Sequence, residues 1–233
     1  HARAHIEKTY ARSAGDQFIR AVLANVLPYR ERFRVALAGA LLAKPLSGVF
    51  GALPVVGKRL RAMIELAPPR FPSREIPEPA PAIAAPARGK VAILEGCAQP
   101  VLKPSINKAA RRMLARHGIE VVTPAGEGCC GALVHHMGRE DEALRFAKAN
   151  VDAWIVEMDR GLDAILLTAS GCGTTVKDYG FMLRDDPAYA DKARRVSEAT
   201  RDITEYLLSL PALGPARPTG QVVAYHSACS MQH

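Results

Sequence analysis

The chain has 233 residues, of which 48% are hydrophobic and 23% are charged. This balance is ordinary for a globular protein and excludes a wholly disordered chain. A chain of this length can bury a core without disulfide bonds, and five cysteines are an odd number for a secreted disulfide framework. The cysteines must therefore serve another purpose.

The formal net charge of +8 is concentrated in one part of the chain. Residues 1–90 contain fifteen Lys or Arg and six Asp or Glu, whereas residues 91–233 contain sixteen and seventeen. A basic segment can bind nucleic acid, acidic lipid headgroups or an acidic protein, or it can be a solvated helix face. Few aromatic residues accompany the arginines and no nucleic-acid-binding motif is present, so we expect no nucleic-acid partner.

Residues 1–66 have the apolar periodicity of short helices, and prolines divide them. We expect no signal peptide, because no cationic segment followed by an apolar run is visible. We also expect no membrane-spanning helix, because a lysine and two prolines interrupt the longest apolar stretch, residues 35–56. Seven prolines follow between Pro68 and Pro86, and they predict an extended connector over residues 67–89.

Strand and helix patterns alternate after the connector. The predicted strands are 90–95, 119–123, 162–168 and 221–225, and the predicted helical segments are 106–117, 132–160 and 189–210, the last broken near Thr200. This alternation is typical of parallel βαβ units. We therefore expect an α/β, Rossmann-like domain over residues 90–220, preceded by the basic helical segment 1–66 and followed by the start of a further unit at 221–233.

Every cysteine follows a predicted strand. The five are Cys97, Cys129, Cys130, Cys172 and Cys229, and glycines stand beside most of them. The carboxyl ends of parallel strands meet at one edge of a sheet, where such folds bind ligands. Helix N-termini at that edge are expected to favour the thiolate form, which is the form that metals require. The first four cysteines match the number of ligands that an iron–sulfur cluster uses.

The cysteines could also have roles other than holding a cluster. Four thiolates suit zinc as well, although zinc ligands usually come as CxxC pairs and this chain has none. Cys129 and Cys130 could form a redox pair, although a disulfide between neighbours is strained. Either of them could act as a nucleophile with His135 or His136, which are expected on the following helix. All five could instead be small buried hydrophobic residues.

The sequence around the cysteines resembles the cysteine-rich CCG domain. The matching segments begin at LEGCAQP, GEGCCGA, TASGCGT and YHSACS. That domain occurs in heterodisulfide reductase, in lactate-utilisation and anaerobic glycerol-3-phosphate dehydrogenase subunits, and in the iron–sulfur subunit of glycolate oxidase, which this sequence resembles most. The ferredoxin-like CxxCxxCxxxCP runs of that family are absent, and only Cys229 of a second CCG repeat is present. The chain thus resembles the central piece of such a subunit, with a single Cys172 where the heterodisulfide reductase pattern has CxxC.

The resemblance implies an electron-transfer subunit without substrate chemistry of its own. Such a subunit passes electrons from a flavin-containing glycolate oxidase subunit, which oxidises glycolate to glyoxylate, toward a membrane quinone. The resemblance implies that an iron–sulfur cluster, expected to be [4Fe-4S], is held by Cys97, Cys129, Cys130 and Cys172. It implies that Cys229 begins a second cofactor site.

The resemblance also implies a cytoplasmic location, with peripheral contact at the inner face of the cytoplasmic membrane. The basic helical segment, including Arg30, Arg32 and Arg34, is then expected to dock on the flavin subunits or on the membrane. Two rival functions remain. A catalytic subunit of the heterodisulfide reductase type, or a lactate or glycerol-3-phosphate dehydrogenase subunit, would use the same cysteines; a basic interaction module would carry them as structural residues.

Overall fold

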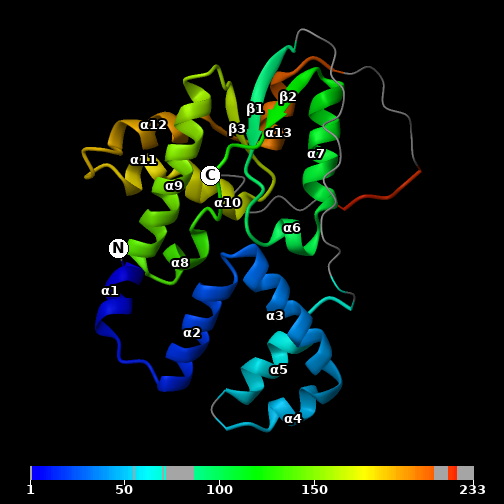
Figure 1. Ribbon diagram of the computed structural model, residues 1–233, viewed down its shortest axis with the longest axis vertical. Coiled ribbons are helices and arrows are strands. Elements are labelled where there is room, and N and C mark those ends of the chain that lie inside the picture. Colours follow the sequence, from blue (N-terminus) through cyan, green and yellow to red (C-terminus); the bar gives the residue numbers. More distant parts are fainter. Residues whose placement is uncertain (1, 55, 70, 72–86, 213–219, 225–233) are drawn as a thin grey trace.

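The structure, a computed structural model, describes residues 2–54, 56–69, 71, 87–212 and 220–224. Its N-terminal part is a helical unit, and the part after the connector is an α/β domain (Figure 1). The helical unit contains α1 (Ala2–Thr9), α2 (Ala14–Val26), α3 (Arg30–Ala43), the 3-10 turn Lys44–Leu46, α4 (Ser47–Gly51) and α5 (Gly57–Glu65).

The α/β domain alternates strands and helices as the sequence predicts. Its strands are β1 (Gly89–Ile93), β2 (Ile119–Val122), β3 (Ala164–Leu167) and β4 (Thr200–Asp202), and they form one parallel sheet in the order β2-β1-β3-β4. Its helices are α6 (Gln99–Leu102), α7 (Ser105–Arg116), α8 (Ala132–His136), α9 (Glu140–Met158), α10 (Ser170–Lys177), α11 (Tyr179–Met182), α12 (Ala190–Ala199) and α13 (Ile203–Ser209). The predicted fold class is confirmed, and the predicted domain boundaries stay predictions.

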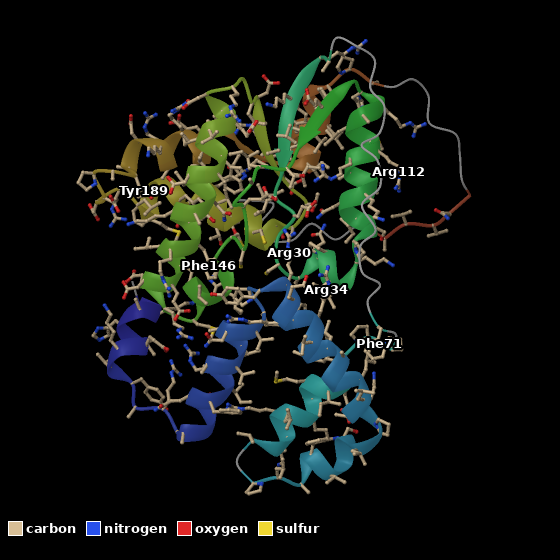
Figure 2. The ribbon with its side chains drawn as sticks, viewed as in Figure 1. Arg30, Arg34, Phe71, Arg112, Phe146 and Tyr189 are labelled. Atoms are coloured by element: carbon tan, nitrogen blue, oxygen red, sulfur yellow. The ribbon has the colours of Figure 1, made fainter. Side chains whose placement is uncertain are left out.

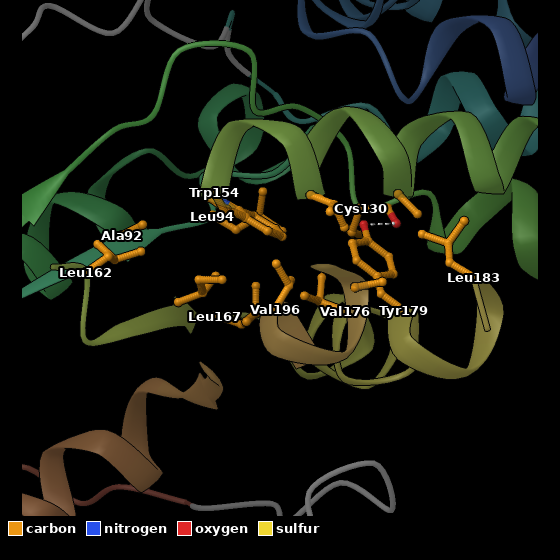
Figure 3. Close-up of a cluster of buried hydrophobic side chains, with 14 residues drawn as sticks. Ala92, Leu94, Cys130, Trp154, Leu162, Leu167, Val176, Tyr179, Leu183 and Val196 are labelled. Atoms are coloured by element: carbon orange, nitrogen blue, oxygen red, sulfur yellow. Dashed lines mark hydrogen bonds between the residues drawn. The ribbon is translucent and has the colours of Figure 1, made fainter. Parts of the chain in front are cut away.

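Helices cover both faces of the sheet, and its two central strands, β1 and β3, are mostly apolar. Val91 and Ile93 point to one face and pack with Leu114 of α7, and α13 completes that layer. Ala92 points to the other face, where the fully buried Trp154 of α9 lies and where α10, α11 and α12 contribute further side chains (Figure 3). This double coverage explains why the strands read as continuous apolar runs rather than as alternating ones.

The fourth strand lies elsewhere than predicted. The strand predicted at 221–225 is wrong for the residues described there, because Gln221 to Ala224 have no regular structure and the side chains of Val222 and Val223 are exposed. The strand β4 instead interrupts the segment predicted as helical at 189–210, at the break expected near Thr200. Most of the proline-rich segment lies outside the described residues.

The reason given against a membrane-spanning helix does not hold, and the expectation itself stays a prediction. Among the described residues, one helical stretch, Arg30–Gly51, is long and apolar enough by length and composition to cross a membrane, and little of it is buried. Pro45 does not end this stretch, because it lies in the first turn of the 3-10 segment. A proline there removes only an N–H that would have had no intrahelical partner.

The helical unit packs against the α/β domain at two places. Arg20 of α2 donates to the carbonyl of Met137, at 2.5 Å, in the turn between α8 and α9. Gly138 in that turn has φ of 81° and lies against the backbone of Arg3, where a β-carbon would clash. The second place is α3, whose Phe33 packs with Val101 of α6. Both contacts adjoin segments that carry cysteines.

Candidate metal centre

The sheet topology places four cysteines together at the carboxyl ends of the strands. Cys97 follows β1, and Cys129 and Cys130 lie between β2 and α8. Cys172, which we expected in a loop, lies in the first turn of α10. Cys229 is outside the described residues, so its expected role stays a prediction.

The four thiols form a connected row. The Sγ atoms of Cys129 and Cys97 are 3.6 Å apart, and the backbone N–H of Gly131 donates to Sγ of Cys129 at 3.4 Å. Cys130 belongs to a buried cluster of side chains against which Cys172 packs. Segments 32 residues apart in the sequence therefore bring two sulfur atoms within 3.6 Å, and segments 42 residues apart bring Cys130 and Cys172 into one cluster.

The glycine after the cysteine pair is required by the backbone. Gly131 has φ of 80°, a left-handed conformation, and it caps the N-terminus of α8. A β-carbon at this position would lie 3.2 Å from the carbonyl oxygen of Ala143 and from Cβ of Phe146. The chain can therefore turn from Cys130 into α8 while it lies directly against α9.

The surroundings raise the pKa of Cys97, Cys129 and Cys130, although the helix N-termini were expected to favour the thiolate form. The neighbouring Cys129 and burial raise the pKa of Cys97 well above its ordinary value. The neighbouring Cys130 and burial raise the pKa of Cys129 to about 12, although Cys97 lowers it. For Cys130, contact with Cys129 lowers the pKa, but Cys172 and burial raise it to about 12. Neighbouring thiols and desolvation thus account for the raised pKa values of these three cysteines.

These pKa shifts weigh against a nucleophilic cysteine. A catalytic thiol needs a lowered pKa so that the thiolate is present at neutral pH. His135 and His136 do lie on the helix after the cysteine pair, as predicted. His136 accepts a hydrogen bond from Arg3 at Nδ1, at 2.6 Å, and so interacts with the helical unit. A bound metal, in contrast, displaces the protons of its thiol ligands and does not need their pKa lowered beforehand.

The four thiols have the chemistry of iron–sulfur ligands. Among the described residues, no group of three His, Cys, Asp or Glu side chains is arranged to hold a metal ion. Four thiols from three chain segments match the number of ligands that an iron–sulfur cluster uses. The donor set contains only soft thiols, which suit iron–sulfur clusters. On its chemistry the residue set therefore fits the group that the sequence implied.

A buried polar network, which was not predicted from the sequence, holds the cysteine pair. Asn150 of α9 is fully buried; it accepts from the N–H of Gly128 at 2.8 Å and donates to the carbonyl of Cys129 at 2.9 Å. The hydroxyl of Tyr179 donates to the carbonyl of Cys130 at 2.8 Å (Figure 3). The same hydroxyl accepts from Asn150 at 3.1 Å. The backbone on both sides of the pair is thus satisfied by side chains from α9 and α11.

A second network lies beside Cys97 and joins the two parts of the protein. Arg30 of α3 donates to the carbonyl of Gly96 at 2.9 Å and pairs with Glu95 at 3.1 Å, at the junction seen in Figure 2. Arg111 of α7 pairs with the other oxygen of Glu95 at 2.9 Å. Nearby, burial raises the pKa of Glu127 to about 7 even though Trp154 donates to its carboxylate.

The three arginines that we expected to dock on a partner are engaged within the chain. Arg30 serves the network just described. Arg32 donates to the carbonyl of Asn25 and lies over the ring of Tyr29, and Arg34 pairs with Glu31. These contacts do not test the expected docking role of the three arginines, which stays a prediction.

Comparison with known proteins gives consistent matches. Residues 91–177 match the family model of the CCG cysteine-rich domain. The chain is 41% identical, over 98% of its length, to the glycolate oxidase iron-sulfur subunit of Escherichia coli K12, and 28% identical over its full length to a probable glycolate oxidase iron-sulfur subunit of Bacillus subtilis. It is 25% identical over 61% of its length to lactate utilization protein A of Bacillus licheniformis, of which it covers 58%. No solved structure matches the chain.

The chain spans about half the length of the first two relatives, 52% and 54%. The matched domain begins inside β1 and ends with α10, so it contains the complete row of described cysteines. Residues 91–177 are therefore similar to the CCG cysteine-rich domain, and the chain as a whole is similar to the iron–sulfur subunits of glycolate oxidase.

Proposed function

We propose that this chain is the central part of an iron–sulfur electron-transfer subunit of a glycolate oxidase. The observation that carries the proposal is the row of four thiols, which the fold assembles from three segments beside glycine turns. The similarity to two proteins named as glycolate oxidase iron-sulfur subunits supports the same conclusion. The chain has no substrate chemistry in this proposal and is inactive without the rest of the complex.

The proposed ligands are the sulfur atoms of Cys97, Cys129, Cys130 and Cys172. We propose a [4Fe-4S] cluster at this site, and a second site to which Cys229 contributes. An iron–sulfur cluster, when bound, accepts and releases single electrons. The chain's own contribution is to bury the sulfur atoms of Cys129 and Cys130, to exclude water from them, and to fix the surrounding backbone through Asn150 and Tyr179.

The proposed partners are the flavin-containing subunits that oxidise glycolate to glyoxylate, and the electrons pass on toward a quinone. We propose a cytoplasmic location with peripheral contact at the inner face of the cytoplasmic membrane. The net positive charge of residues 1–90 supports contact with an anionic partner. No nucleic acid is involved in this proposal.

The test uses the whole complex, purified without oxygen. Glycolate is added, and the visible absorbance and the paramagnetic resonance of the iron–sulfur centres are followed. We expect glycolate to reduce the centres, and we expect no reduction when the flavin subunits are left out. Reduction by lactate or glycerol 3-phosphate instead of glycolate would reassign the complex to a related dehydrogenase. Oxidation of the centres by a disulfide substrate would favour the heterodisulfide reductase type.

A further inference from the structure

The helical unit contains an apolar cavity that the cysteine site does not use. Its volume is about 500 Å³, and it lies among α2, α3 and α5. Its lining includes Val22, Val26, Leu37, Gly39, Leu60 and Met63. Leu66, which also lines it, is 83% exposed, so the cavity opens to the surface. A folded protein normally fills such a space, and an open apolar cavity of this size is suited to an apolar ligand.

A stripe of exposed apolar side chains runs along the neighbouring helical stretch. The stripe consists of Val35, Leu42, Leu46 and Val49, which are 56–74% exposed. Their spacings of seven, four and three residues place them on one face of the helical stretch Arg30–Gly51. Soluble monomers seldom expose a continuous apolar surface of this kind. This helix face is therefore suited to contact with another apolar surface, such as a protein or the interior of a lipid bilayer.

The charge of the helical unit indicates which apolar surface contacts this helix face. Residues 30–67 contain seven Lys or Arg and two Glu. Anionic lipid headgroups attract such basic segments, and an exposed apolar helix face enters the boundary between headgroups and acyl chains. Binding of a second copy of the chain at this face would bring like positive charges together, and their repulsion opposes such a dimer. Figure 1 shows α4 and α5 at the end of the molecule farthest from the sheet, where a flat surface can reach them.

We propose that the helical unit docks on an anionic lipid bilayer, with the stripe inserted between lipids and one acyl chain entering the apolar cavity. The role of this contact rests on the proposed function, since an electron-transfer subunit that serves a quinone has to reach the membrane. The lipid contact itself needs no iron. Failure of membrane binding and failure of the iron–sulfur assignment are therefore seen in separate measurements.

The first test is flotation of the whole protein with vesicles. We expect binding to vesicles of phosphatidylcholine mixed with phosphatidylglycerol, and much weaker binding to pure phosphatidylcholine. The double variant Val35→Gln, Leu42→Gln removes two inserted side chains, and we expect it to lower the binding constant by about tenfold or more. The matched control is Leu208→Gln, since Leu208 on α13 is 87% exposed and lies outside the helical unit. We expect this control to bind as the unchanged protein does.

The second test addresses the cavity. An added β-carbon at Gly39, which lines the cavity, or at Gly48, which does not, meets no atom within 4 Å. Both substitutions to Leu can therefore be made without a clash at Cβ, but only the larger side chain at Gly39 competes with an acyl chain. We expect Gly39→Leu to weaken vesicle binding several-fold and Gly48→Leu not to weaken it.

Three results would overturn the proposal. One is equal binding to anionic and neutral vesicles, or no binding to either. Another is an equal effect of Gly39→Leu and Gly48→Leu with the fold of both retained by circular dichroism. The last is that the flavin subunits, and not vesicles, protect Leu42 and Leu46 from a surface label in the assembled complex. That result would assign the face to a protein partner.

Discussion

The hydroxyl of Tyr179 holds the backbone of the cysteine pair, and its removal tests how the site is stabilised. Tyr179 is fully buried, and its hydroxyl donates to the carbonyl of Cys130 at 2.8 Å. Tyr179→Phe keeps the ring and removes only this oxygen. The carbonyl of Cys130 then loses this partner, and Asn150 loses one of its acceptors.

The expected loss follows from these two hydrogen bonds. A typical hydrogen bond contributes about 1 kcal/mol net, and a buried acceptor without a partner costs about 1–3 kcal/mol. We therefore expect Tyr179→Phe to lower the free energy of unfolding by about 2–3 kcal/mol. The assay is urea unfolding of the metal-free, reduced protein, in which the midpoint should fall while the slope m stays the same. The native-state reactivity of the Cys130 thiol should rise as well.

Tyr189→Phe is the matched control. Its hydroxyl donates to Asp152 at 2.8 Å on the protein surface, where water can replace it. We expect a change within about 0.5 kcal/mol for this variant. A change of Tyr179→Phe within the same range, or an equal loss in both variants, would refute the role given to the Tyr179 hydroxyl.

Three further predictions concern the surroundings of the site. Gly131→Ala should lower the free energy of unfolding by more than Gly161→Ala does. Both glycines have positive φ, but only a β-carbon at position 131 would lie 3.2 Å from other atoms. Equal losses in urea unfolding would contradict this prediction. Arg30→Met should speed proteolysis between the helical unit and the α/β domain, whereas Arg194→Met, which breaks only exposed ion pairs, should not. Burial, Arg3 and His135 lower the pKa of His136 from 6.5, so the folded state binds fewer protons than the unfolded state. The free energy of unfolding should therefore fall as the pH drops through 6.5. His136→Gln should reduce this pH dependence, and an unchanged pH dependence would contradict the lowered pKa of His136.

The fold class and the gathering of the cysteines could be predicted because both follow from local patterns. The runs that became β1, β2 and β3 are rich in apolar residues, and a parallel sheet brings their carboxyl ends together. Cys97, Cys129 and Cys130 therefore could be placed from their distance to these runs. β4 could not, since three residues are too short to show a period.

The side chains that hold the site could not be predicted from their own segments. Asn150 lies in the middle of a long helix, where a polar residue normally faces solvent, and Tyr179 reads as an ordinary apolar position. Their roles depend on α9 and α11 meeting at the cysteine pair. The raised thiol pKa values had the same origin, because the burial of the cysteines and the approach of Cys97 to Cys129 are tertiary features.

The iron and acid-labile sulfide content of the whole protein, purified without oxygen, decides whether the row of four thiols holds a cluster. We predict iron and sulfide in similar amounts and a paramagnetic signal on reduction. The Cys130→Ser variant should lose the iron and sulfide that are bound at this site, whereas Tyr189→Phe should keep them. Less than about one iron per chain would contradict the assignment, since a cluster ligated by four cysteines contains at least two. The same would be true if replacing Cys97, Cys129, Cys130 and Cys172 together left the iron content unchanged.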